Sequence, residues 1–283
     1  MPGFTTRFAP SPTGLLHRGH AYSALKAWSA AREADGRFIL RIEDIDTTRC
    51  RPAFEADLLE DLSWLGLGWE EPVRRQSEHM ADYHAALERL CDRGLAYRCF
   101  RTRREVAQEM ASAPHGTAPA FRGAALSPTE ESERLARGEP FAWRLSLEAA
   151  RSELGSFTDL TFEEEGAGPE GQHGLITALP DLAGDIILAR KDVGVAYHLA
   201  VTVDDALQGV THIIRGEDLF EATHIQRLLQ ALLGLPTPVY RHHALLRGAD
   251  GVRLAKRHNA ETLQSLRTAG MKPGTLRKDL GFD

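Results

Sequence analysis

Two histidines near the amino terminus have a spacing that could serve phosphate chemistry. His17 and His20 stand three residues apart with Gly19 between them, after a proline-rich segment. If a helix begins here, both imidazoles lie on one face, and the glycine lets a ligand approach the backbone. The free N–H groups and partial positive charge of a helix N-terminus favour a phosphate. The alternative is a pair of histidines that cap a surface helix, and the short His-x-x-His pattern taken alone favours this alternative, because such patterns recur by chance.

A basic segment more than two hundred residues further along has matching chemistry. Lys256 is flanked by Arg253 and Arg257 and follows the turn signal of residues 248–251. A flexible loop that carries Lys256 could close on a polyphosphate and stabilise the charge that develops there. Alone, such a segment is typical of a solvated charge run. Together with the N-terminal histidines it predicts a nucleotide site, with both histidines and Lys256 as catalytic residues.

The elements that must position these side chains have the order strand, loop, helix, strand. Residues 5–9 are extended, and the prolines and glycine of residues 10–14 force a tight loop. Ala, Leu and charged residues dominate 20–34, which predicts a helix. The continuous apolar run 37–42 is typical of a strand covered on both faces of a parallel sheet. This order is a βαβ unit of the Rossmann type, in which ligands bind beyond the carboxyl ends of the strands.

The rest of the chain continues the α/β fold around an inserted segment. Residues 112–140 are rich in Ala, Pro, Gly, Ser and Glu, which indicates an insertion rather than a new core. We also expect helices at 52–64 and 78–94, a helix ending near 233, strands at 141–147, 185–189, 197–203 and 212–214, and an acidic loop at 163–174. The predicted organisation is a first half of the core at 1–97, an inserted subdomain at 98–140, a second half of the core at 141–240, and a basic loop with a helical segment at 241–283.

Composition and charge narrow the class of protein. The 283 residues are 42% apolar, enough for a core, and 34 Lys and Arg against 40 Asp and Glu give a net charge of −6. This balance argues against a protein that binds DNA or coats nucleic acid non-specifically. A local basic patch could still hold a structured RNA. Three cysteines without disulfide spacing, no secretory signal and no apolar run of membrane-spanning length predict a cytoplasmic protein without a membrane partner.

Taken together, the motifs resemble the class I aminoacyl-tRNA synthetases of the glutamate branch. Residues 7–20 are similar to the HIGH signature of that branch, and residues 253–257 are similar to its KMSKS loop. Residues 41–47 and 203–216 also match the branch. The resemblance covers nearly the whole chain and implies a Rossmann-type catalytic core that binds ATP.

The length points to one group within that branch. Only 26 residues follow Arg257, too few for the helical anticodon-binding region of ~100 residues or more in an ordinary glutamyl-tRNA synthetase. We therefore expect no anticodon-binding domain, as in the glutamyl-queuosine tRNA(Asp) synthetases, which residues 216–220 and 233–238 also resemble. That resemblance implies activation of L-glutamate with ATP and Mg²⁺, without tRNA, and transfer to queuosine-containing tRNA(Asp). The alternatives are a core-only glutamyl-tRNA synthetase that charges the tRNA 3′ end and a non-catalytic binding paralogue.

A site for glutamate should offer guanidinium groups to the side-chain carboxylate and a carboxylate to the amine. Arg7, Arg215 and Glu43 are of these types, and alternation along the strand puts Glu43 at its carboxyl end. Taken singly, Tyr197 would be a packing residue of a strand, and Arg215 would form a surface ion pair with the acids that follow it. The resemblance implies amino-acid contacts from Arg7, Phe8, Ala9, Pro10, Ser11, Glu43, Tyr197 and Arg215, and ATP contacts from His17, Gly19, His20 and Lys256.

The chain departs from the branch in its inserted segment. Many relatives hold zinc there with Cys-x-Cys, a tyrosine and a further cysteine before an arginine, whereas here only Cys99 remains and Phe121 stands before the arginine. One thiolate cannot make a four-ligand zinc site, and a loop histidine such as His115 is usually solvated. We therefore predict no zinc and no resident metal.

The same segment contains several arginines. Arg98, Arg101, Arg103 and Arg104 would form a basic cluster on an otherwise acidic protein. Such a cluster either contacts tRNA phosphates or begins a solvated helix, and the spacing does not decide between the two.

Overall fold

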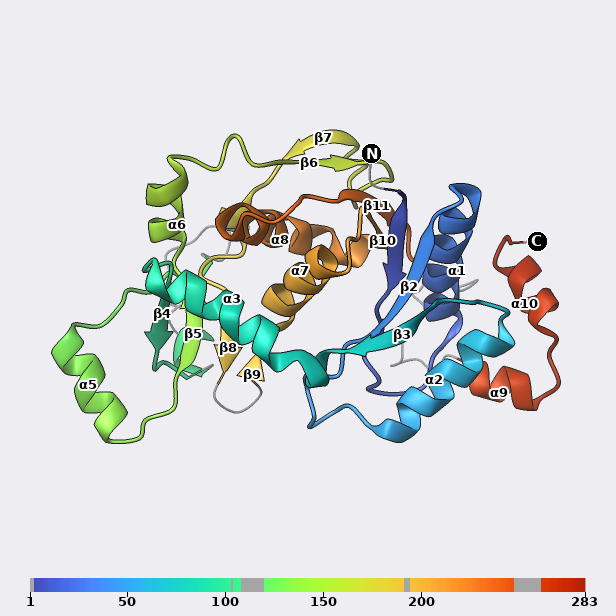
Figure 1. Cartoon of the computed structure of the whole chain (residues 1–283), viewed down its shortest axis with the longest axis horizontal. Coiled ribbons are helices and arrows are strands. Elements are labelled where there is room, and N and C mark those ends of the chain that lie inside the picture. Colours follow the sequence, from blue (N-terminus) through green and yellow to red (C-terminus); the bar gives the residue numbers. More distant parts are fainter. Residues whose placement is uncertain (1–2, 103, 108–119, 191–193, 247–260, 283) are drawn as a thin grey trace.

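The centre of the molecule is a mostly parallel layer built from two sheets (Figure 1). The computed structural model describes residues 3–102, 104–107, 120–190, 194–246 and 261–282. One sheet holds β1 (Thr5–Phe8), β2 (Arg37–Ile42) and β3 (Glu70–Arg75), and the other holds β10 (His212–Gly216), β11 (Val239–His243), β6 (Thr161–Glu164) and β7 (Gly174–Thr177). Within these two sheets the pairings are parallel, except that of β6 with β7.

The two sheets meet at β1 and β10. The Thr211 backbone N–H donates to the Thr5 carbonyl at 2.9 Å, and the Thr5 N–H donates to the Thr211 hydroxyl at 2.9 Å. The strands therefore run in the order β3-β2-β1-β10-β11-β6-β7 across the molecule. Open α/β sheets bind ligands where the strand order reverses, which here is between β1 and β10. The Rossmann-type α/β fold predicted from the sequence is confirmed.

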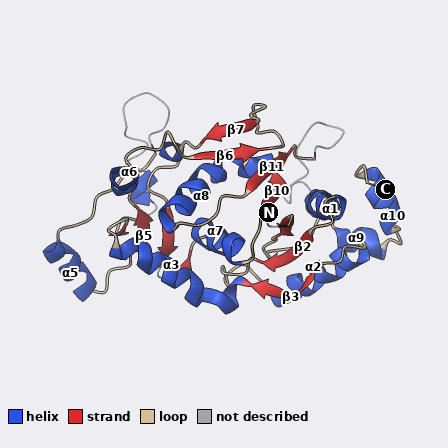
Figure 2. Cartoon of the chain, turned by 45° about the horizontal axis from the view of Figure 1, so that its top comes forward, coloured by secondary structure: helices blue, strands red, loops and turns tan. Residues whose placement is uncertain are grey.

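Helices cover both faces of this layer (Figure 2). One face carries α1 (Arg18–Glu33), α2 (Pro52–Trp64), α9 (Leu263–Thr268) and α10 (Pro273–Asp279), and the other carries α3 (Met80–Asp92), α7 (Tyr197–Leu207) and α8 (Phe220–Leu233). Neighbouring residues of β10 pack into the hydrophobic cores on opposite faces of the layer. Ile213 packs with α7 and α8, and Ile214 packs with α1. Alternation along strands buried on both faces produces this division. None of the described helices has the length and apolar character needed to cross a membrane.

A third sheet, which is antiparallel, lies at the end of the molecule opposite α9 and α10 (Figure 1). It contains β4 (Ala96–Cys99), β5 (Ala142–Leu145), β8 (Ile187–Arg190) and β9 (Gly194–Val195), in that order, with α5 (Pro128–Ala136) and α6 (Leu147–Leu154) nearby. The predicted boundaries after residues 97 and 140 fall inside β4 and shortly before β5, and these two strands pair with each other. The division of the chain into four parts stays a prediction.

One predicted strand is a helix. Residues 197–203 form the first part of α7, which packs against α3 and α8. The consecutive residues from Leu199 to Asp205 are all buried. Because neighbours surround this helix, its sequence lacks the apolar stripe of a surface helix and resembles a buried strand. Tyr197 is therefore the first residue of a helix rather than a packing residue of a strand.

Candidate active site

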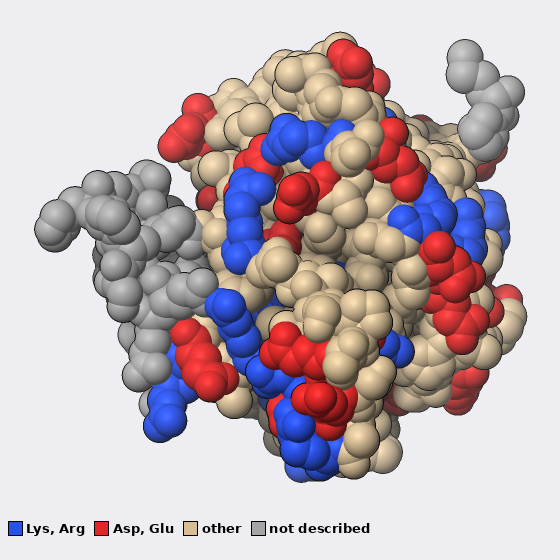
Figure 3. Space-filling model, turned by 90° about the vertical axis from the view of Figure 1, so that its left-hand side faces the viewer, with Lys and Arg blue, Asp and Glu red and all other residues tan. Residues whose placement is uncertain are grey.

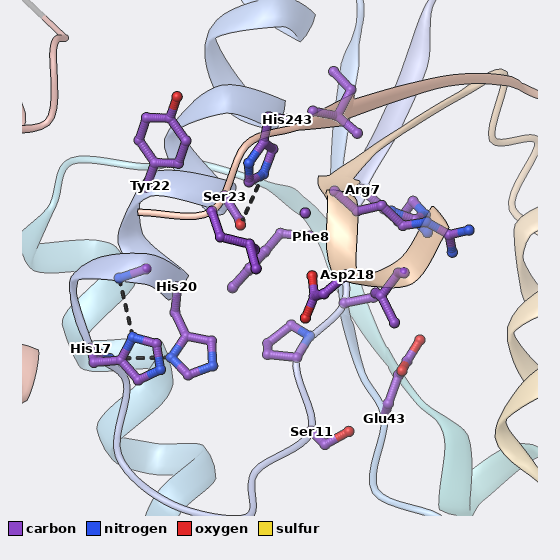
Figure 4. Close-up of a pocket in the computed structure, with 18 of the residues that line it drawn as sticks. Arg7, Phe8, Ser11, His17, His20, Tyr22, Ser23, Glu43, Asp218 and His243 are labelled. Carbon is purple, nitrogen blue, oxygen red and sulfur yellow. Dashed lines mark hydrogen bonds between the residues drawn. The ribbon is translucent and has the colours of Figure 1, made fainter. Parts of the chain in front are cut away.

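A cavity of about 400 Å³ opens at the junction of β1 and β10 (Figure 4). It lies beyond the carboxyl ends of β1, β2 and β10, where this topology places a ligand. Every predicted site residue in the described part of the chain lines it, namely Arg7, Phe8, Ala9, Pro10, Ser11, His17, Gly19, His20, Glu43, Tyr197 and Arg215. The structure thus brings together side chains from both halves of the chain, and the individual roles given to them stay predictions.

Lys256 and the rest of the basic loop lie outside the described residues. The described residues on either side of that loop lie at the cavity or beside one of its lining residues. Leu246 lines it, and Thr262 forms a β-bridge with His17. The catalytic role of Lys256 stays a prediction from the sequence.

His17 and His20 lie at the start of α1, at one end of the cavity (Figure 4). The Gly19 backbone N–H donates to Nδ1 of His17 at 3.1 Å, and the His17 backbone N–H donates to Nδ1 of His20 at 3.2 Å. Their ring centroids are 3.9 Å apart. Because both Nδ1 atoms accept, each neutral ring carries its proton on Nε2. The histidines therefore cap the helix and also line the cavity, so the two alternatives considered from the sequence are compatible.

The other end of the cavity is a buried cluster of opposite charges. Arg7 Nε donates to Asp205 Oδ1 at 3.1 Å, and Arg41 Nη2 donates to the same oxygen at 2.7 Å. Arg41 is fully buried and also lies 3.6 Å from Asp204 and 3.5 Å from Glu43. Burial raises the pKa of Asp205, but Arg7 and Arg41 outweigh burial and hold that pKa below its ordinary value. The bond to Asp205 fixes the Arg7 guanidinium beside the cavity.

Glu43 follows β2 directly and lines the cavity beside this cluster. Its backbone N–H donates to the Pro10 carbonyl at 3.0 Å, which ties the strand end to the proline-rich loop. Its Oε1 has no hydrogen-bond partner among the described residues. Burial raises the pKa of Glu43 to about 7, although Arg41 and Arg7 act in the opposite direction. A cationic ligand such as an ammonium group would stabilise the charged carboxylate.

Arg215 reaches the cavity from the end of β10 and is only 5% exposed. Its Nε donates to His242 Nε2 at 3.1 Å, and its Nη2 donates to the Thr223 hydroxyl at 2.8 Å. The alternative of a surface ion pair with the following acids is therefore wrong. Its Nη1 is buried and has no hydrogen-bond partner among the described residues. An unpaired buried donor on a charged group is costly, so this nitrogen indicates an anionic ligand.

Three groups at the site were not predicted from the sequence. Asp205 anchors Arg7, His242 anchors Arg215, and His243 Nε2 lies 3.0 Å from the Ser23 hydroxyl at the cavity wall (Figure 4). Asp205 stands inside the matched segment 203–216, and two adjacent histidines in a strand are an unusual pair. Neither pattern indicates which distant side chain these residues contact.

A smaller cavity of about 200 Å³ shares Ser11, Glu43 and Tyr197 with the first. Its other lining residues include Asp46 and Arg49, from the segment that follows β2. The two cavities therefore have a common wall. Two reactants, one in each cavity, could meet at this wall.

The described residues include no group of three or more His, Cys, Asp or Glu side chains that could hold a metal ion. Cys99 is buried in an apolar cluster with Tyr97 and Phe121. His115 lies outside the described residues. The absence of zinc stays a prediction, and metal analysis of the purified protein would check it.

Basic and acidic side chains alternate on the face at the antiparallel-sheet end of the molecule (Figure 3). Arg98 pairs with Glu131 at 3.0 Å, and its guanidinium lies 4.4 Å from the centroid of the Trp143 ring. It belongs to strand β4 rather than to the start of a helix. Arg103 lies outside the described residues. Contact between this arginine cluster and tRNA phosphates stays a prediction.

The strand order and the position of the cavity define an α/β protein of the Rossmann type, with its cavity where the strand order reverses. Comparison with known families identifies one family within this class. Residues 4–280 match the family described as "tRNA synthetases class I (E and Q), catalytic domain". The chain belongs to that family.

Similar proteins fall into two groups. A glutamyl-Q tRNA(Asp) synthetase from Rhodobacter capsulatus is 49% identical over 283 residues, which span 98% of this chain and 99% of that relative. A glutamate–tRNA ligase from Aquifex aeolicus is 38% identical over 279 residues, which span 98% of this chain and 56% of that ligase. The crystal structure of a glutamate-tRNA synthetase from Elizabethkingia anophelis matches with a TM-score of 0.75 at 28% identity, over 90% of this chain and 53% of that one.

Proposed function

We propose that the protein activates L-glutamate with ATP and transfers the glutamyl group to the queuosine base of the tRNA(Asp) anticodon. The charge pattern of the larger cavity is the observation that supports glutamate as the amino-acid substrate. Arg7 and Arg215 offer buried guanidinium groups, and Glu43 offers a carboxylate whose Oε1 accepts no hydrogen bond from the described residues. These charges are complementary to the side-chain carboxylate and the ammonium group of glutamate.

The acceptor is supported by the relatives rather than by a single side chain. The glutamyl-Q tRNA(Asp) synthetase shares 49% of residues with this chain over nearly all of its own length. The glutamate–tRNA ligase shares 38%, and the match covers little more than half of that ligase. This difference favours transfer to queuosine over charging of the tRNA 3′ end.

The first step joins the amino acid to AMP. An oxygen of the glutamate α-carboxylate attacks the α-phosphorus of ATP, the bond to the β-phosphate oxygen breaks, and pyrophosphate leaves. The N-terminus of α1 and the Nε2–H groups of His17 and His20 would stabilise negative charge on the phosphates, together with Lys256. Mg²⁺ is expected to enter with ATP and to neutralise part of its charge.

The second step transfers the glutamyl group to RNA. A hydroxyl of the queuosine cyclopentene ring attacks the carbonyl carbon of the adenylate and loses its proton. The bond from that carbon to the phosphate oxygen breaks, and AMP leaves. The smaller cavity adjoins the larger one at Ser11, Glu43 and Tyr197, so it offers a route for the hydroxyl to the carbonyl. A cytoplasmic location, expected from the sequence, suits a tRNA substrate.

Two measurements test the proposal. Glutamate-dependent ATP–pyrophosphate exchange should proceed without any RNA, and a strict requirement for tRNA would favour the core-only glutamyl-tRNA synthetase. Radiolabelled glutamate should then be transferred to tRNA(Asp) that contains queuosine and not to the same tRNA without it. Transfer to both forms would contradict the proposed acceptor, and absence of exchange with every amino acid would favour a binding paralogue.

A further inference from the structure

A buried chain of hydrogen bonds leads from strand β6 to Arg215. Nδ1 of His242 lies 2.5 Å from Oε2 of Glu164, and both side chains are 0% exposed. On the opposite side of the imidazole, Nε2 accepts the hydrogen bond from Arg215 Nε at 3.1 Å. Because Nε2 accepts, the proton of the neutral ring is on Nδ1, where it is donated to Glu164. The order carboxylate, imidazole, guanidinium is therefore fixed by the geometry.

Glu164 is itself held rigidly. Its Oε1 accepts hydrogen bonds from the backbone N–H groups of His242 and Gly166, each at 2.8 Å. A side chain at position 166 would come within 2.1 Å of the His242 carbonyl oxygen, so a glycine is required for this close approach. The carboxylate therefore has fixed donors for both oxygens and orients the His242 ring.

The arrangement leaves one guanidinium nitrogen for a ligand. Arg215 Nε donates to His242, and Nη2 donates to Thr223. Nη1 is buried and has no hydrogen-bond partner among the described residues. Arg215 lines the larger cavity, whereas neither Glu164 nor His242 is among the residues that line it. Glu164 and His242 therefore act on a ligand only through Arg215.

Burial lowers the pKa of His242, and Arg215 lowers it further, against the opposing effect of Glu164. The ring is thus neutral near pH 7 and keeps Nε2 as an acceptor.

We propose that Glu164 and His242 are positioning residues that hold the Arg215 guanidinium with Nη1 toward the side-chain carboxylate of the amino-acid substrate. This inference rests on the proposed activation of glutamate and adds the residues that set its specificity for a carboxylate. A misplaced guanidinium would weaken glutamate binding and would leave the ATP end of the cavity unaffected, because that end is built from α1.

The test compares two substitutions at His242. In H242N the amide nitrogen replaces Nδ1 and still donates to Glu164, but the acceptor for Arg215 Nε is lost. In H242Q an amide oxygen lies near the former position of Nε2 and can accept from Arg215. We expect H242N to raise the KM for glutamate in pyrophosphate exchange by ~10- to 100-fold, the scale of a charge-assisted hydrogen bond. The KM for ATP should stay near the wild-type value, and H242Q should recover most of the loss.

A second variant acts on the proton rather than on the ring. In E164Q the amide can donate to Nδ1, which moves the imidazole proton to Nε2 and places two donors face to face at Arg215 Nε. E164Q keeps the size of the side chain and carries the test if H242N does not fold. It should also raise the KM for glutamate and reduce the preference for glutamate over glutamine.

His224 provides the matched control. Its buried ring packs on Phe220, with centroids 5.4 Å apart, as the His242 ring does at 5.2 Å, but it accepts its hydrogen bond from the Leu179 N–H. H224N should leave the KM for glutamate unchanged. Wild-type values in both H242N and E164Q, or an equal rise in H224N, would overturn the positioning role. A wild-type enzyme without glutamate-dependent exchange would instead overturn the proposed function.

Discussion

The two ends of the larger cavity are built in different ways. At the histidine end, the imidazoles of His17 and His20 accept from backbone N–H groups two and three residues away. At the arginine end, Arg7 is held by Asp205, 198 residues away, and Arg215 by His242 on another strand. A local cap depends on one short segment, whereas buried charges depend on every partner around them. Changes at the arginine end should therefore destabilise the fold more than changes at the histidine end.

The largest effect is expected for D205A. This substitution leaves the Arg7 and Arg41 guanidinium groups buried without the carboxylate oxygen that both contact. Removing one partner from a buried ionic group costs about 3–5 kcal/mol. Urea unfolding at pH 7 should show a decrease of that size in the free energy of unfolding.

A carboxylate at the histidine end is the matched control for D205A. Glu261 pairs with Arg18 at 3.4 Å, and its side chain is 62% exposed. Exposed pairs contribute about 0–1 kcal/mol, so E261A should change the stability little. An equal loss in the two variants would contradict the contrast between the ends.

The second effect is a pH dependence that comes from Glu43. Its pKa is about 7 in the folded protein and near 4.5 in the unfolded chain. Between these values the folded state binds the extra proton, so stability falls as pH rises from about 4.5 to about 7. The difference corresponds to roughly 3 kcal/mol. E43Q has no proton to lose and should not show this decline.

Unfolding curves at pH 4.5 and pH 7.5 check the prediction. The wild type should lose roughly 3 kcal/mol more than E43Q between the two pH values. Parallel behaviour would mean that Glu43 is ionised in the folded protein well below pH 7. Glutamate binding by the wild type should strengthen as pH rises through about 7, because the charged carboxylate holds the ammonium group.

The same contrast between local and distant contacts separates what could be predicted from the sequence from what could not. His17 and His20 could be placed because their spacing and their cap belong to one segment. Asp205 and His242 could not be paired with Arg7 and Arg215, because no periodicity connects residues on different elements. The βαβ unit was predictable since 37–42 is buried on both faces, but the same burial on all sides made α7 look like a strand. β3 was missed because most of its six residues are charged or exposed.

The third effect is expected for H20A, which should separate stability from activity. His20 accepts the His17 N–H and completes the cap of α1. Loss of this bond should cost about 1 kcal/mol, whereas glutamate-dependent pyrophosphate exchange should fall by ~10² if the ring contacts phosphate. H20Q can reach the same backbone N–H, since glutamine serves this position in capping boxes. Recovery of stability without recovery of exchange would assign the imidazole to the reaction, and recovery of both would reduce it to a cap.

The smallest effect on stability is expected for H17N. Asparagine is among the preferred N-cap residues, and its side-chain oxygen can accept the Gly19 N–H that His17 Nδ1 now accepts. The free energy of unfolding should therefore stay within about 0.5 kcal/mol of the wild type. Thermal unfolding with and without ATP gives the measurement: the variant should melt like the wild type alone and gain less from ATP. A large loss of stability in H17N would show that the histidine end also depends on distant contacts, such as the bridge between His17 and Thr262.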